Sequence, residues 1–406
     1  MRSCLLTICL LLALGAAARA QSPAGDLNND YRVDQADLVL FAGQWLASES
    51  PTADLNGDGE VNGIDLARLA RHWGDVTCPI VINELLAHSH DDAPDWIELS
   101  NPSSIAVHVG GWVLSDDKDD LYKYQIPVGT IAEPNSYLVF YEDLSFGNPL
   151  DPNTLNPFKM SENGEGLYLY SGNDPIFPDY LTAETFGASE TWVSFGRHER
   201  STGSHAFVRL SEPTPDGVNA YPLVGPVIIN EIMYHPGADG DAEYVELLNI
   251  SGQLVTLFDF ISLEPWRFTD DAGIELAFPA DAPVTLQAGE HVLLVKDERL
   301  ARATYPIGPG VQVFEWGSGK LANDADRIRL LQPGDLDDQG TRYWIEIDRV
   351  DYSDGSHGGG FEDGIDPWPV EADGSGLSLN RRAVLRYGDD PNNWEAAIPS
   401  PGSAND

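Results

Sequence analysis

The sequence predicts a mainly β protein in which a small helical module precedes two similar β-sandwiches. Residues 79–406 consist of short segments rich in Val, Ile, Tyr and Trp, separated by Gly, Pro, Asn and Asp, which is typical of strands and turns. The order of these segments occurs twice, which predicts a repeated sandwich unit. Residues 26–73 differ, because each of two acidic segments there is followed by apolar residues at helical spacing.

The first twenty residues have the pattern of a secretory signal peptide. Arg2 precedes an apolar run over residues 5–17, and Ala18 and Ala20 form a small-residue cleavage site. The run is short for a membrane span. We therefore expect cleavage after Ala20 and a secreted, extracellular chain without a membrane span.

The net charge argues against one class of partner, and the cysteine content argues against disulfides as a source of stability. The chain has a formal net charge of −42 at pH 7, which repels phosphate backbones and argues against a nucleic-acid partner. Cys4 and Cys9 lie in the predicted signal peptide, so Cys78 remains alone and no intramolecular disulfide is expected. Stability must then come from apolar cores and bound ions.

The two acidic segments have the spacing of EF-hand calcium loops. Oxygen-bearing side chains stand at loop positions 1, 3, 5, 9 and 12, while position 7 supplies a backbone carbonyl. In loop 1 these positions are Asp26, Asn28, Asp30, Arg32 (position 7), Asp34 and Asp37. In loop 2 they are Asp54, Asn56, Asp58, Glu60 (position 7), Asn62 and Asp65. Calcium takes six to eight oxygen ligands, so we expect two calcium ions, one in each loop.

One helix is predicted after each loop. Apolar residues at i, i+3, i+4 and i+7 are Leu38, Phe41, Ala42 and Trp45 after loop 1, and Leu66, Leu69, Ala70 and Trp73 after loop 2. Too few residues precede Asp26 for an entering helix, and the link 47–53 contains Pro51. We expect the two apolar faces to bury each other.

These residues resemble a dockerin domain, a calcium-binding module of secreted proteins. The resemblance covers about residues 25–74, within a module that we expect to span 23–77. It implies calcium-dependent binding to a cohesin-like protein partner. Many dockerins carry a Ser-Thr pair at loop positions 10 and 11, where this chain has Gln35-Ala36 and Gly63-Ile64. The identity of the partner therefore stays open.

The remaining sequence is one unit written twice, over residues 79–221 and 226–406. Asn83-Glu84 recurs as Asn230-Glu231, and the motif Trp96-Ile-Glu98-Leu recurs as Tyr244-Val-Glu246-Leu. Gly111-Trp-Val-Leu-Ser-Asp corresponds to the region 258–271, where residues 264–269 are expected to interrupt the motif. The order of these motifs resembles the lamin tail domain, an immunoglobulin-like sandwich. That resemblance implies a binding or structural module and assigns no catalytic residue.

Four sets of residues allow a chemical or a structural interpretation. The paired Glu of each copy could act as acid and base, as in glycoside hydrolysis, or could bond backbone or pair with Arg at a sandwich end, which we favour. A loop with His88, His90, Asp91 and Asp92 could bind a metal or be solvated, and Asp116, Asp117, Asp119, Asp120, Asp270 and Asp271 could hold calcium or form solvated turns. Four tryptophans could stack on sugars or fill cores: Trp112, Trp266, Trp316 and Trp368.

The sequence thus predicts a secreted, non-catalytic modular protein. A calcium-dependent dockerin would attach two lamin-tail-like domains to an extracellular partner or surface. The alternative is an accessory or hydrolytic subunit of an extracellular polysaccharide-degrading assembly. A carbohydrate or cell-surface ligand of the sandwiches stays open at this point.

Overall fold

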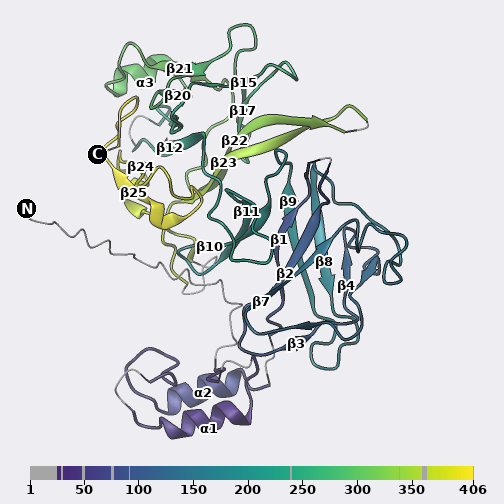
Figure 1. Cartoon of the computed structure of the whole chain (residues 1–406). Helices are drawn as coiled ribbons and strands as arrows, with labels where there is room; N and C mark the ends of the chain where they lie inside the picture. The colour runs from purple at the N-terminus through teal and green to yellow at the C-terminus, as the bar shows by residue number, and fades with distance from the viewer. Residues whose placement is uncertain are drawn as a thin grey trace, which may run out of the picture. The chain divides into compact units, whose positions relative to one another are not determined.

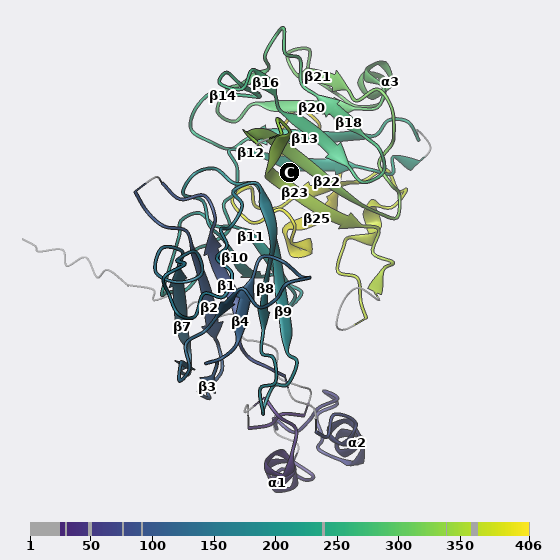
Figure 2. The same cartoon turned by 90° about the vertical axis from the view of Figure 1, so that its right-hand side faces the viewer.

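A computed structural model describes residues 25–28, 31–47, 51–74, 77–90, 92–237, 240–337, 339–358 and 364–405. The described chain is mainly β, with two helices in the N-terminal module and a third in the second sandwich, so the predicted fold class is confirmed (Figures 1 and 2). The predicted signal peptide, residues 1–20, lies outside the described residues. Within the described ranges, no helix has the length and apolar character of a membrane span.

The helical module repeats one local structure. Helix α1 spans Gln35–Gly43 and helix α2 spans Gly63–Arg71. Asp34 and Asn62 cap the helix N-termini, each through a side-chain oxygen that accepts a backbone N–H two residues on. Asp37 and Asp65 accept the N–H of the capping residue in return. These reciprocal bonds satisfy donors that the first helical turn leaves free, which is why each helix begins there.

The core of the module differs in part from the prediction. Its buried residues are Val33, Phe41, Ala53, Val61 and Leu69. Leu38 and Leu66 on the helices, and Trp45 and Trp73 just beyond the helix ends, are instead 37–49% exposed. Ala42 and Ala70 are exposed as well, so the expected mutual burial of two apolar helix faces is wrong except at Phe41 and Leu69. Each nine-residue helix buries a single apolar side chain, Phe41 or Leu69. The rest of the core comes from Ala53 and from the valines at position 8 of the loops, Val33 and Val61.

The two halves of the module are also hydrogen-bonded to each other, in each case through the backbone carbonyl at position 8 of a loop. The N–H of Leu46, just after α1, donates to the carbonyl of Val61 in loop 2 at 2.9 Å. The N–H of Gly74, just after α2, donates to the carbonyl of Val33 in loop 1 at 2.8 Å. Each helix end therefore holds the other half's loop, which makes the two loops interdependent.

The first sandwich contains a five-stranded and a four-stranded sheet. The larger sheet has the order β11-β10-β1-β2-β7 and the smaller the order β5-β4-β8-β9, while β3 and β6 pair separately. The strands are β1 (Val81–Leu86), β2 (Trp96–Asn101), β3 (Val107–His108), β4 (Val113–Ser115), β5 (Tyr124–Gln125), β6 (Ile131–Ala132), β7 (Ser136–Tyr141), β8 (Gly164–Tyr170), β9 (Leu181–Gly187), β10 (Phe195–Glu199) and β11 (His205–Arg209).

The second sandwich has sheet orders β21-β20-β13-β12-β24-β25 and β18-β17-β22-β23, with the separate pairs β14–β19 and β15–β16. Its elements are β12 (Val227–Met233), β13 (Tyr244–Asn249), β14 (Val255–Thr256), β15 (Phe258–Asp259), β16 (Glu264–Pro265), β17 (Arg267–Asp270), β18 (Glu275–Ala277), β19 (Thr285–Leu286), β20 (His291–Val295), α3 (Glu298–Thr304), β21 (Gln312–Glu315), β22 (Ala325–Leu336), β23 (Arg342–Ser353), η3 (Val370–Ala372), β24 (Ser378–Arg381), η4 (Pro391–Asn393) and β25 (Trp394–Ala397).

The strand orders show that the sequence repeat is a structural repeat. The order β11-β10-β1-β2-β7 of the first sandwich corresponds to β25-β24-β12-β13-β20 of the second, and the order β5-β4-β8-β9 corresponds to β18-β17-β22-β23. Val113 on β4 pairs with Tyr170 on β8, and Arg267 on β17 pairs with Leu331 on β22. Trp112 precedes Val113 and Trp266 precedes Arg267, so the two tryptophans occupy equivalent positions in the two sandwiches. The expected interruption at 264–269 therefore needs correction: the inserted element is the β15–β16 hairpin, and the motif resumes at Trp266.

Candidate functional site

Loop 2 of the helical module is folded around its acidic side chains. The two carboxylate oxygens of Asp54 accept the N–H groups of Gly57 and Gly59 at 2.9 and 2.8 Å. Asp58 Oδ1 accepts the N–H of Glu60 at 3.0 Å, and Asn56 donates to Asp58 Oδ2 at 2.8 Å. The hydrogen bonds from Asn56 and from the Glu60 backbone hold the pKa of Asp58 below its usual range, which keeps this exposed carboxylate ionised.

Loop 1 has the same fold where it is described. Asp26 Oδ2 accepts the N–H of Tyr31 at 2.8 Å, as Asp54 accepts that of Gly59. Position 6 requires a left-handed backbone in both loops, with φ of 65° at Tyr31 and 90° at Gly59. Tyr31 adopts this conformation although glycine favours it, and its ring is buried. Asp30 lies outside the described residues.

Asp37 and Asp65 close the two loops from buried positions. Asp37 Oδ1 accepts the N–H groups of Leu27 and Asn28, and Asp65 Oδ1 accepts those of Leu55 and Asn56, at 2.7–3.2 Å. Both carboxylates are fully buried. Among the described residues no Lys or Arg forms an ion pair with either. Burying a carboxylate that stays ionised is costly without a positive charge beside it, and a cation in the loop would supply that charge.

The ligand types at these positions fit calcium. Each described loop position offers a carboxylate, amide or backbone oxygen, which are the ligands that this hard cation takes. No imidazole or thiolate belongs to either set. The predicted residues therefore lie together in two loops, with the exception of Asp30, whose place is not described.

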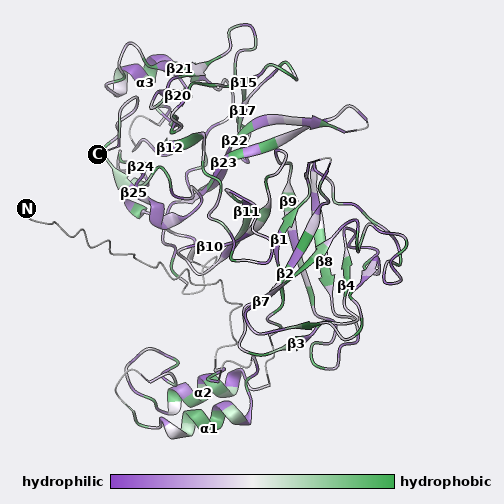
Figure 3. Ribbon diagram, in the orientation of Figure 1, coloured by the Kyte–Doolittle hydropathy of each residue, from purple (hydrophilic) through white to green (hydrophobic). Residues whose placement is uncertain are grey.

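The surface of the module carries an exposed apolar set on both helices. Figure 3 shows hydrophobic colouring along α1 and parts of α2. The exposed set consists of Leu38, Val39, Leu40, Trp45 and Leu46 at α1, and Ile64, Leu66 and Trp73 at α2. Contiguous exposed apolar surface often marks a site that a partner covers, and these eight residues are the candidates for such a site in the module.

The repeated glutamates of the first sandwich form a buried clamp. Glu84 on β1 accepts the N–H and the hydroxyl of Thr214 at 2.9 and 2.6 Å. Glu98 on the neighbouring strand β2 accepts the N–H of Asp216 at 2.6 Å and a side-chain N–H of Asn83 at 2.7 Å. Both glutamates are fully buried. They fasten the segment after β11 to the sheet.

The second sandwich repeats this clamp with the segment after β25. Glu231 accepts the N–H of Ser400 at 3.0 Å, and Glu246 accepts the N–H of Gly402 at 2.6 Å. Asn230 donates to Glu246 at 2.8 Å, as Asn83 does to Glu98. The interpretation that the paired glutamates hydrogen-bond backbone is therefore confirmed in both copies.

Burial also sets the protonation of these groups. Desolvation raises the pKa of Glu98 to about 8, and the negative charge of Glu84 adds to this effect. Desolvation likewise raises the pKa values of Glu84 and Glu231. A neutral carboxyl suits a dry position whose hydrogen bonds are satisfied.

The remaining candidates take structural positions. His88 contacts the Ser189 carbonyl and the Thr191 hydroxyl at 2.9 and 3.0 Å, whereas His90 stacks on Trp192 with ring centres 5.2 Å apart. These two histidines therefore use their rings for separate contacts, Asp92 is exposed, and Asp91 lies outside the described residues. All four tryptophans considered for sugar stacking are buried: Trp112, Trp266, Trp316 and Trp368.

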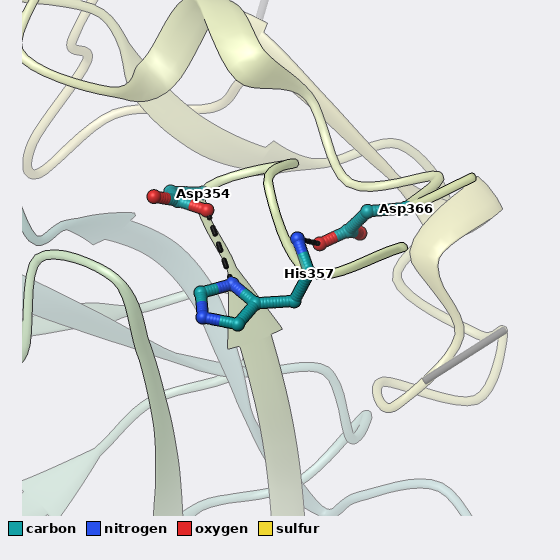
Figure 4. Close-up of side chains that lie close together, drawn as sticks. All are labelled: Asp354, His357 and Asp366. Carbon is teal, nitrogen blue, oxygen red and sulfur yellow. Dashed lines mark hydrogen bonds and ion pairs between the residues drawn. The ribbon is translucent and has the colours of Figure 1, made fainter. Parts of the chain in front are cut away.

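One cluster escaped the sequence interpretation. Asp354, His357 and Asp366 place potential ligand atoms within 4.8 Å of one another in the long link between β23 and β24 (Figure 4). Residues 354–377 form this link, whereas the corresponding link of the first sandwich is only residues 188–194. The greater length of this link in the second copy was the one sequence feature that could have drawn attention to it. The spacing of the residues does not predict that Asp366 lies beside His357, because the two are nine positions apart.

Fold and loops together define a modular protein, with a helical module of EF-hand-type loops followed by two sandwiches of one topology. The family model of the Lamin Tail Domain matches residues 75–176 and 222–354, and the chain belongs to this family. The model of the Dockerin type I domain matches residues 24–74. Dockerin domains in general bind calcium and cohesins and occur in extracellular proteins. A comparison with curated proteins finds no match.

Proposed function

We propose that this protein is secreted and uses its dockerin, loaded with two calcium ions, to attach two lamin tail domains to a cohesin-like extracellular partner. Loop 1 would bind one ion through Asp26, Asn28, Asp30, Asp34, Asp37 and the Arg32 carbonyl. Loop 2 would bind the other through Asp54, Asn56, Asp58, Asn62, Asp65 and the Glu60 carbonyl. Domain boundaries of 23–77, 79–221 and 226–406 belong to the same proposal.

The observation that carries the calcium proposal is the burial of Asp37 and Asp65. Each carboxylate accepts three backbone N–H groups, which fixes the loop, but those neutral donors leave the negative charge uncompensated. Calcium would supply that charge and draw the remaining loop oxygens inward. Because each helix end is bonded to the opposite loop, an ion in one loop would also order the other.

The exposed apolar set supports the docking proposal. Val39 and Ile64 are 64% and 57% exposed on α1 and α2, in a module whose own core is already complete. A protein partner would cover these side chains and release water from them. The sandwiches act as the attached modules in this proposal, since their paired glutamates are buried and hydrogen-bonded in the clamps.

Binding of the full chain to an immobilised cohesin tests the proposal. Binding should require calcium, should be lost with chelator, and should weaken at least tenfold in Val39→Glu and Ile64→Glu. Val128→Glu is the matched control, because Val128 is an 88% exposed valine of the first sandwich and its substitution should leave binding unchanged. Equal binding with calcium and with chelator would contradict the proposal.

A further inference from the structure

The inserted link of the second sandwich brings three potential metal ligands together. Figure 4 shows Asp354 paired to the imidazole of His357 and Asp366 bonded to the backbone N–H of His357, and the ligand atoms of all three lie within 4.8 Å of one another. Gly358 makes this approach possible, because a side chain there would collide with the carbonyl of Gly364. The close passage of these two glycines sets Asp366 beside His357.

The oxygens around the imidazole are too many for its hydrogen-bonding capacity. Nδ1 of His357 lies 3.3 Å from Asp354 Oδ1, 3.2 Å from Ser353 Oγ and 3.4 Å from Ser356 Oγ. One ring nitrogen carries at most one proton or one lone pair, so it cannot bond to all three. The 3.3 Å between Nδ1 and Asp354 Oδ1 is close to the separation of neighbouring ligand atoms around a tetrahedral zinc ion with bonds of about 2.0–2.1 Å. A carboxylate oxygen of Asp366 lies within 4.8 Å of a ligand atom of each of these two residues.

Both carboxylates retain coordination capacity. Asp366 Oδ2 accepts the Ser353 hydroxyl and the His357 N–H, whereas Oδ1 accepts one bond, from the Trp368 N–H. Asp354 Oδ1 accepts the N–H of Ser356, and the Ser356 hydroxyl also hydrogen-bonds to this carboxylate. These second contacts hold the carboxylates in place, as outer hydrogen bonds do at metal centres.

The surrounding charge also favours a cation. Within the described ranges, neither Asp354 nor Asp366 forms an ion pair with a Lys or Arg. The hydroxyl of Tyr234 is buried nearby without a hydrogen-bond partner among these residues. Burial raises the pKa of Tyr234, and the negative charges of Asp373, Asp354 and Asp366 raise it further, so the same carboxylates act on a buried phenol. A divalent cation would cancel the two carboxylate charges.

We propose that Asp354, His357 and Asp366 form a site for a divalent transition metal of the zinc type, with water completing its coordination. The imidazole nitrogen favours such a metal over calcium, which takes oxygen ligands. The ion would join two points of the 354–377 link, on either side of residues 359–363. The first sandwich, with its short link, lacks this site.

Zinc titration of the full chain tests the site. The chain is stripped with chelator, dialysed into millimolar calcium to fill the oxygen-only loops, and titrated with zinc in a calorimeter. We expect one zinc per chain in wild type and in His108→Ala, the matched removal of an exposed histidine on β3. His357→Ala should weaken this binding at least tenfold, and so should Asp354→Asn, which keeps the shape of the loop.

Cobalt supplies a second readout. Substituted cobalt should give the visible absorption of a nitrogen- and oxygen-coordinated ion in wild type and in His108→Ala, and no such band in His357→Ala. The proposal is overturned if wild type binds no zinc under these conditions. It is equally overturned if folded His357→Ala and Asp354→Asn bind zinc as tightly as wild type does.

Discussion

Substitution of the loop-closing residue Asp65 by alanine should unfold the dockerin. Asp65 accepts the N–H groups of Leu55, Asn56 and Asn62 at 2.9–3.1 Å from a fully buried position. Hydrogen bonds to a charged group contribute about 1.5–3 kcal/mol each, so three of them amount to roughly 4–9 kcal/mol. A module of about 50 residues has a total unfolding free energy of only roughly 3–7 kcal/mol.

The loss should reach the other half of the module. Loop 2 holds the end of α1 through the bond from Leu46 to Val61, and α2 holds loop 1 through the bond from Gly74 to Val33. Asp65→Ala should therefore abolish calcium binding in loop 2 and weaken it in loop 1. Glu60→Ala is the matched control within the same loop, because the exposed side chain of Glu60 is not a predicted ligand.

Calorimetric titration and far-UV circular dichroism of the segment 23–77 measure both effects. The segment carries its own complete apolar core, so it can be studied alone. Wild type and Glu60→Ala should bind two calcium ions and lose helical signal in chelator. If Asp65→Ala still binds two ions and keeps the wild-type helical signal, the proposed role of this carboxylate is refuted.

Three further predictions concern the sandwiches. Between about pH 4.5 and pH 8, Glu98 keeps its proton in the folded protein but releases it in the unfolded chain, so the stability of segment 79–221 should fall as pH rises. The midpoint of urea unfolding should depend less on pH in Glu98→Gln than in wild type. Asn219 donates to the carbonyls of Asn83 and Arg197, so Asn219→Ala should lower the unfolding free energy of the first sandwich by about 2–3 kcal/mol in urea. Asn405 makes the equivalent bonds in the second sandwich, so Asn405→Ala should destabilise the second sandwich and leave the first unchanged. The chain should not hydrolyse polysaccharide, and turnover that Glu98→Gln or Glu246→Gln abolishes would refute the structural role of these residues.

The clamps explain why two glutamates recur in plain strands of both copies. Each pair holds a chain segment that lies more than a hundred residues away in sequence, from Glu84 to Thr214 and from Glu231 to Ser400. Each glutamate accepts a backbone N–H of that segment, and side-chain hydroxyl or amide donors bond to the same carboxyl groups. The recurring glutamates therefore mark the place where this segment is held in each copy.

The sequence alone determined the features that depend on local spacing. Oxygen side chains at fixed loop positions specified both EF-hand-type loops and the helices after them, because one loop and one helix turn involve only near neighbours. The repeated order of short strands specified two sandwiches. The recurring Asn83-Glu84 and Asn230-Glu231 marked equivalent positions in both copies, although they could not show what those positions contact.

Tertiary structure decided the features that depend on distant partners. Helical periodicity identified Trp45 and Trp73 as apolar, but competition from Val33 and Val61 for the small core left both half-exposed. The partners of Glu84 and Glu98 became visible only when the sheet brought residues 214–219 beside them. Asp366 meets His357 only because the backbone passes closely at Gly358 and Gly364. Such contacts depend on how the chain packs in three dimensions, which spacing along the sequence does not encode.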